Sequence, residues 1–192
     1  MSADSVRVSL VTTTEAFQQV MTVRREVFVE EQQIDSSLEF DANDTKFSEQ
    51  LNSSSYQDDI QTNFMRYYLA ELVHQTEAPS ESSSSTSIQT KVGGTCRARK
   101  TGENSWKIER FAVLKNLRGF GMGRKLLRFV LLDLGVKQQD KPKIYLHAQL
   151  SAVPFYQKCI FEEEGLKGRF LIVGDQFEEA SIPHCKMEWQ WE

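Results

Sequence analysis

The fold class of this chain is decided by the stretch Leu117-Arg118-Gly119-Phe120-Gly121-Met122-Gly123. It follows a strand-like segment at residues 107–114 and precedes residues 124–134, where leucine and valine recur at helical spacing. A strand that runs into glycines and then into a helix places free backbone N–H groups at the positive end of the helix dipole. The loop therefore predicts a site for a phosphate or pyrophosphate.

Basic side chains surround this loop on a chain whose formal net charge is -4. They are Arg118, Arg124, Lys125 and Arg128. The same pattern also fits a tight strand-to-helix turn with a solvated basic helix end, so the loop alone does not establish a ligand.

Two familiar phosphate motifs are excluded by residue positions. A Walker A loop needs a Gly-Lys pair followed by Ser or Thr, whereas Lys125 follows Arg124 and precedes Leu126. A Rossmann fingerprint needs Gly-x-Gly-x-x-Gly, but the glycines here stand at every second position. Nucleotide binding of either kind is not expected.

Composition favours one domain over residues 1–192, because 192 residues with 40% hydrophobic content can bury one substantial core. The net negative charge argues against nucleic-acid or membrane partners. Cys96, Cys159 and Cys185 are odd in number and far apart, which favours a reducing compartment over a disulfide framework. With no apolar leader or membrane-length apolar run, we expect an intracellular, cytoplasmic protein, with a nuclear location left open. The oligomeric state is not readable.

Alternating and helical patterns predict an α/β chain with a mixed sheet. A helix starts near Thr12–Glu15, with Thr13 or Thr14 as alternative caps, and continues toward Phe28. Residues 30–44 read as an acidic, irregular loop, and residues 45–63 and 75–90 as polar, mobile insertions. The predicted strands are 6–11, 64–73, 92–99, 107–114, 144–148, 170–173 and 185–191, and further helices are 124–134 and 152–159.

Residues 118–123 resemble the Arg/Gln-x-x-Gly-x-Gly/Ala loop of the GNAT superfamily of N-acetyltransferases. Further segments, in family order, are similar to its ElaA/YjcF-like branch: residues 23–32, 39–41, 94–97, 147–149, 153–158 and 182–184. The resemblance implies the GNAT acyl-CoA N-acyltransferase fold, in which a mostly antiparallel, twisted sheet splays at the cofactor site and is flanked by helices.

The resemblance also implies the donor and the reaction. A primary amine would attack the thioester of acetyl-CoA directly in a ternary complex, without a metal. Strand residues implied to contact the pantetheine arm are Phe111, Ala112 and Val113. Residues implied to bind the pyrophosphate are Arg118, Gly119, Phe120, Gly121, Met122, Gly123 and Arg124.

Proton transfer needs an acid and a base, because the amine must lose a proton and the departing thiolate is better protonated. Tyr156 matches the family tyrosine that serves as the acid, although an ordinary packed aromatic is the alternative. Glu109 and His147 are candidate bases; each could instead be structural, and a water chain could replace both.

The acceptor side is the least determined part of the sequence. The resemblance places Arg24, Phe28, Glu39, Asp41 and His184 there. Acidic charge would favour a cationic acceptor, namely a small amine, an amino sugar or a lysine side chain, unless the acidic stretch is only a solvated loop. The rival function is a non-catalytic acyl-CoA-binding or protein-interaction module.

Overall fold

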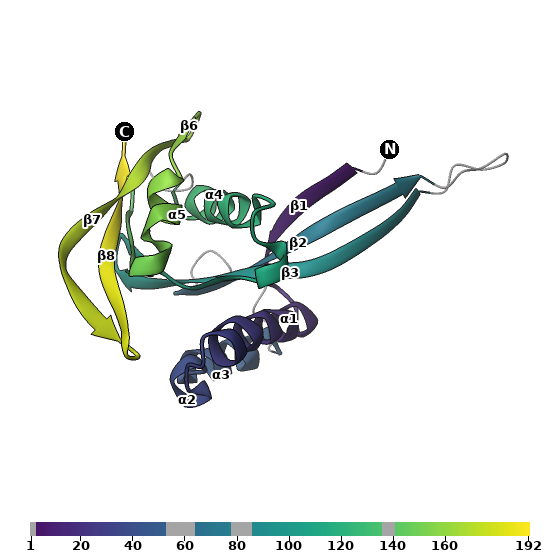
Figure 1. The fold of residues 1–192 in the computed structure, drawn as a ribbon, viewed down its shortest axis with the longest axis horizontal. Coiled ribbons are helices and arrows are strands. Elements are labelled where there is room, and N and C mark those ends of the chain that lie inside the picture. The colour runs from purple at the N-terminus through teal and green to yellow at the C-terminus, as the bar shows by residue number, and fades with distance from the viewer. Residues whose placement is uncertain (1–2, 53–63, 78–85, 136–140) are drawn as a thin grey trace.

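The computed structural model describes residues 3–52, 64–77, 86–135 and 141–192. Its strands form one eight-stranded sheet in the order β1-β2-β3-β4-β5-β8-β7-β6 (Figure 1). The strands are β1 (Ala3–Leu10), β2 (Met65–Glu77), β3 (Thr86–Gly102), β4 (Ser105–Val113), β5 (Lys143–Gln149), β6 (Phe161–Glu163), β7 (Leu166–Glu179) and β8 (Ile182–Trp191). Neighbouring strands are antiparallel except β4 and β5, which run parallel. The predicted α/β class with a mostly antiparallel mixed sheet is confirmed.

Helices cover both faces of the sheet (Figure 1). On one face lie α1 (Thr14–Arg24), the π-helical turn η1 (Arg25–Glu31), α2 (Ser36–Glu39) and α3 (Ala42–Leu51). The opposite face carries α4 (Met122–Gly135) and α5 (Val153–Lys158), each preceded by a 3₁₀ turn, η2 (Lys115–Leu117) and η3 (Leu150–Ala152). In the described residues no helix is long and apolar enough to cross a membrane.

The helix ends follow from local sequence. Thr13 is the N-cap of α1, because its side chain accepts a hydrogen bond from Ala16 N at 3.2 Å. Asp41 caps α3 in a capping box, in which the side chain of Asp44 accepts from the Asp41 backbone N–H. The apolar stripe of α4 is buried as its spacing predicts, at Leu126, Leu127, Val130, Leu131 and Leu134.

The parallel strands β4 and β5 separate part-way along their length. They pair only from Ser105 opposite Lys143 to Ile108 opposite Leu146. Just beyond that point Arg110 has a φ of 53°, and the β3–β4 register shifts between Thr95 and Arg97. Such a bulge bends its strand, so residues 109–113 of β4 do not pair with residues 147–149 of β5, which pair only with β8. The resemblance described above implied a sheet that splays in this way.

Two stretches differ from the sequence predictions. Residues 30–44 were expected to be an irregular acidic loop, and this is wrong, because they contain α2 and the start of α3. Residues 45–51, expected in a polar insertion, continue α3 and bury Phe47 against Phe17 and Tyr67 at ring distances of 5.1 and 4.3 Å. Residues 75–77 and 86–90 belong to β2 and β3, and the short β6 was not predicted. Residues 53–63 and 78–85 lie outside the described residues.

Candidate functional site

A cavity of about 830 Å³ opens where β4 and β5 separate. Its walls come from both splayed strands, the loop before α4, the α5 helix, η1 and the turn between β7 and β8. All the predicted donor-binding residues except Phe120 line it. Phe120 does not line the cavity and is 64% exposed.

The glycine loop presents backbone rather than side chains to this cavity. Gly119 and Gly121 have φ angles of 87° and 76°, and no atom lies within 4 Å of where a Cβ would stand. The first turn of α4 is closed by the hydrogen bond from Lys125 N to Gly121 O at 3.0 Å. The N–H groups of Met122, Gly123 and Arg124 precede that bond and have no carbonyl one turn earlier in the helix. Their positions fit a pyrophosphate.

Two arginines beside the loop are held by the protein itself. Arg118 donates to both oxygens of Glu31 at 2.7 Å and to Val113 O at 2.9 Å. Arg124 donates to Lys158 O and Ile160 O at 3.1 and 2.6 Å. These bonds join the loop to η1 and α5, so both guanidinium groups shape the cavity mouth.

The splayed part of β4 supplies the second half of a donor site. Beyond Ile108, its edge toward β5 has no strand partner, while its other edge still pairs with β3 at Ala112 and Val113. Unpaired strand N–H and C=O groups are obligatory hydrogen-bonding groups that a ligand with amide bonds can satisfy. The pantetheine arm of an acyl-CoA has such amides, and these residues therefore fit the expected cofactor.

Tyr156 reaches the cavity from α5. It is 6% exposed and packs edge-on against Phe111 and Phe170 at ring distances of 5.9 and 5.7 Å. Burial, followed by the neighbouring Cys96 and Cys159, raises the pKa of its phenol well above the usual range. Tyr156 is therefore protonated at neutral pH, although the same shift makes its phenol a weaker acid than a free tyrosine.

Glu109 and His147 stand at the vertex of the splay, immediately after the last β4–β5 pair. The Glu109 carboxylate lies 3.0 Å from Arg97 Nε, 3.0 Å from Arg99 Nε and 3.8 Å from Lys107 Nζ. Only the Arg99 contact has hydrogen-bond geometry. His147 Nδ1 instead lies 2.8 Å from Glu179 Oε2 on β7. The two candidate bases thus have different surroundings.

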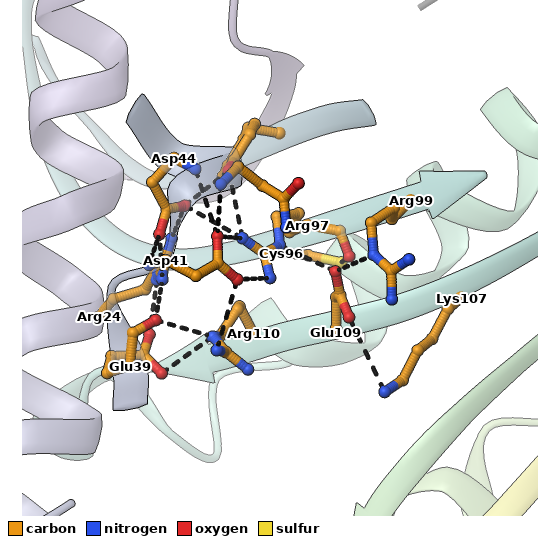
Figure 2. A network of polar contacts seen from close by, with 12 residues as sticks. Arg24, Glu39, Asp41, Asp44, Cys96, Arg97, Arg99, Lys107, Glu109 and Arg110 are labelled. Atoms are coloured by element: carbon orange, nitrogen blue, oxygen red, sulfur yellow. Dashed lines mark hydrogen bonds and ion pairs between the residues drawn. The ribbon is translucent and has the colours of Figure 1, made fainter. Parts of the chain in front are cut away.

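Beneath β4, a buried charge network joins the sheet to α1, α2 and α3 (Figure 2). Arg24 is fully buried and donates at 2.6 Å to both Glu39 Oε1 and Asp44 Oδ1. Arg97 donates to Asp41 at 2.9 and 2.7 Å. Arg110 lies 3.0 Å from Glu39 through its Nε atom. The acidic stretch predicted as a solvated or acceptor-facing loop is therefore largely neutralised by arginines.

The carboxyl groups of this network differ in pKa. Burial raises the pKa of Glu39 above its usual value, and Arg24 and Arg110 offset this only in part. Burial also acts to raise the pKa of Asp44, but the hydrogen bonds from Arg24 and Tyr67 hold it below its usual value. Asp44 is thus the firmly ionised centre of the network.

The residues predicted for the acceptor side separate into two groups. Phe28, Glu39 and His184 line the cavity, whereas Arg24 and Asp41 do not. The burial and ion pairs of Arg24 give it a structural position instead. His184 Nδ1 lies 2.7 Å from Ile182 O, and its ring stacks on Phe177.

Sequence reasoning missed Arg110, Arg97 and Glu179. Arg97 lies within the segment 94–97 that resembles the family, which was a usable signal. Nothing local marks an arginine for a positive φ, and Glu179 becomes a partner of His147 only through the pairing of β5, β8 and β7. In the described chain no cluster of three or more His, Cys, Asp or Glu side chains could hold a metal ion.

With this geometry in view, the family described as "Acetyltransferase (GNAT) domain" matches residues 28–191. The chain belongs to this GNAT acetyltransferase family. The predicted family is confirmed, and GNAT proteins use acyl-CoA.

Similar proteins cover nearly the whole chain. The Bacillus subtilis (strain 168) protein YyaT is 28% identical over 182 residues, which covers 95% of this chain and 94% of YyaT. Escherichia coli ElaA has a similar structure, with a TM-score of 0.63, 21% identity and coverage of 97% and 99% of the two chains. An acyl-CoA N-acyltransferase from Pseudomonas aeruginosa has a TM-score of 0.61 and 18% identity, with coverage of 97% of this chain and 99% of that chain. At these identities the two structures support the fold alone.

Proposed function

We propose that this protein transfers an acetyl group from acetyl-CoA to a primary amine, by direct attack in a ternary complex. The acceptor class spans small amines, amino sugars and lysine side chains. The observation that carries the proposal is the single cavity that joins the glycine loop and open β4 edge to Tyr156, Glu109 and His147.

The cavity is lined by residues from elements on both faces of the sheet. Along β5, Ile144, Leu146 and Ala148 are buried toward α4 and α5, and His147 alternates with them toward the opposite face. Gln149, two residues on, donates to Gln32 beside η1 at 2.8 Å, which identifies that face. Donor and acceptor could therefore meet across the splay, as direct attack requires.

The proposed reaction needs one group that donates a proton and one that accepts a proton. The amine nitrogen bonds to the thioester carbonyl carbon, the C–S bond breaks, and a proton must reach the leaving sulfur. Tyr156, kept protonated by burial, is proposed to give that proton and to recover one from the amide nitrogen as it forms. A group at the vertex, Glu109 or His147, would first take a proton from the ammonium form of the acceptor.

The test is release of free CoA thiol from acetyl-CoA in the presence of a broad panel of primary amines. Turnover with at least one amine is expected. Binding of acetyl-CoA without turnover on any amine would favour the non-catalytic module instead.

Tyr156→Phe sharpens this test, because it removes only the hydroxyl. We expect kcat to fall about 10²-fold, within the range for loss of a general acid, with the Kd for acetyl-CoA within about twofold of wild type. Tyr145→Phe is the matched control, since Tyr145 is on β5 but does not line the cavity. An unchanged kcat in Tyr156→Phe would remove Tyr156 as the acid.

A further inference from the structure

Glu179 and His147 form a carboxylate–imidazole pair at the acceptor end of the cavity. Glu179 lies at the end of β7, and both residues line the cavity wall. The contact joins His147 Nδ1 to Glu179 Oε2 at 2.8 Å, which is hydrogen-bond distance. Phe177 packs edge-on against the His147 ring at 4.8 Å, and this contact restricts the ring's orientation.

The protonation state of the pair follows from Glu179. Burial acts to raise its pKa, but the hydrogen bond from His147 and the charges of Lys107, His147 and His184 outweigh it and hold the pKa below its usual value. Glu179 is therefore a carboxylate at neutral pH and can only accept, so Nδ1 of His147 carries the proton. A neutral imidazole with a proton on Nδ1 has its lone pair on Nε2.

Nε2 of His147 is the nitrogen available to an acceptor. It has no hydrogen-bond partner among the described residues, and the His147 side chain is 28% exposed. The other carboxylates of the cavity are already occupied by permanent cations: Glu109 by Arg97, Arg99 and Lys107, and Glu39 by Arg24 and Arg110. Glu179 differs from both in that its hydrogen-bond partner is an imidazole.

We propose that His147 Nε2 takes the proton from the ammonium form of the acceptor and that Glu179 is the positioning residue that holds His147 in the required tautomer. This proposal rests on the proposed acetyl transfer. The proton moves from R–NH₃⁺ to Nε2, giving imidazolium, and the free amine then attacks the thioester. The second proton leaves the amide nitrogen toward the thiolate, and the imidazolium returns its proton to solvent. The acceptor class is accordingly a primary amine that is cationic at neutral pH.

Other charged and titratable groups surround the pair and could affect its pH response. They are Lys107 and Glu109 on β4, Tyr145 on β5, and His184 and Lys186 on β8. A test therefore needs a variant that removes the Glu179 charge alone and a control that removes the same charge nearby.

Glu179→Gln is that variant, and Glu178→Gln is its matched control, because Glu178 is the exposed neighbour on the same strand and does not line the cavity. For Glu179→Gln we expect kcat/KM to fall at least about tenfold, with the Kd for acetyl-CoA unchanged. Glu178→Gln should match wild type in kcat/KM and in the Kd for acetyl-CoA.

The outcomes separate the two proposals. A Glu179→Gln enzyme with the wild-type kcat/KM would overturn the role of Glu179 while leaving acetyl transfer intact. If wild type releases no thiol with any amine, acetyl transfer fails and the proton route fails with it. A substrate-free measurement is the ¹⁵N NMR spectrum of the His147 imidazole at neutral pH: a proton on Nδ1 is expected, and a proton on Nε2 would contradict the proposal.

Discussion

The buried network beneath β4 and the basic loop before α4 both contain arginines that pair with carboxylates, but the pairs differ in exposure. The Arg24 and Arg97 side chains in the network are 0% and 2% exposed, whereas Arg118 and Arg128 beside the loop are 42% and 45% exposed. In the network every arginine faces carboxylates from helices or strands distant in sequence. The loop also offers backbone N–H groups to the proposed donor. We therefore expect the buried pairs to contribute to stability and the exposed pairs to contribute little.

The largest effect should come from breaking the network at Asp44. Asp44 accepts hydrogen bonds from Arg24 at 2.6 and 3.0 Å and from the Tyr67 hydroxyl at 2.6 Å. Asp44→Ala would remove one of the two carboxylates that face buried Arg24 and would leave the Arg24 and Tyr67 donors without this acceptor, so the free energy of unfolding should drop by about 3–5 kcal/mol. Urea denaturation followed by circular dichroism measures this. A loss below about 1 kcal/mol would mean that the network does not hold α1 and α3 to the sheet.

The network also predicts a pH dependence. Because the folded-state pKa of Asp44 is lowered, its contribution to stability is present above the unfolded-state pKa of about 3.9 and is lost as the pH falls through the folded-state value. The difference in unfolding free energy between wild type and Asp44→Asn should therefore be greatest at about pH 6–7 and should become smaller below about pH 4. A difference that grows on acidification would contradict this assignment.

An intermediate effect is expected at the loop, where binding rather than stability should change. Gly121→Leu places a side chain where the backbone is to approach the donor, so the Kd for acetyl-CoA should rise more than about tenfold. Gly174→Leu is a matched control: its φ is 80° against 76° for Gly121, and both positions are open. Both variants should lose about 1–2 kcal/mol of stability from backbone strain, but only Gly121→Leu should lose affinity by calorimetry. Equal affinities would remove the loop as the donor site.

The smallest effect should follow from Glu31→Ala. Its ion pair with Arg118 is partly exposed, with side-chain exposures of 31% and 42%. Exposed pairs contribute about 0–1 kcal/mol, so urea denaturation should give an unfolding free energy within that range of wild type. A loss as large as that of Asp44→Ala would erase the distinction between the two regions.

The features that could be predicted from the sequence are those that depend on local patterns. Leucine spacing over residues 124–134 and the glycines at 119–123 are local patterns, and they gave α4 and its loop correctly. The order of matched segments gave the family and the sheet class.

Long-range partners account for the errors. The acidic stretch at residues 30–44 looked unpaired because Arg97 and Arg110 come from β3 and β4, with Arg97 lying 56 residues from Asp41. A local signal was available at Asp41 and Asp44, which form the α3 capping box. Arg110, whose positive φ lies at the start of the splay, donates to Leu38 O and Glu39 O, and neither feature has a sequence signature.

In the proposed reaction, donor and acceptor meet directly across the splay of β4 and β5. Initial rates of thiol release, measured while acetyl-CoA and an active primary amine are both varied, test it most directly. Double-reciprocal lines that intersect are predicted, because both substrates must be bound before the acetyl group moves. Parallel lines, which indicate an acetylated enzyme intermediate, would contradict it.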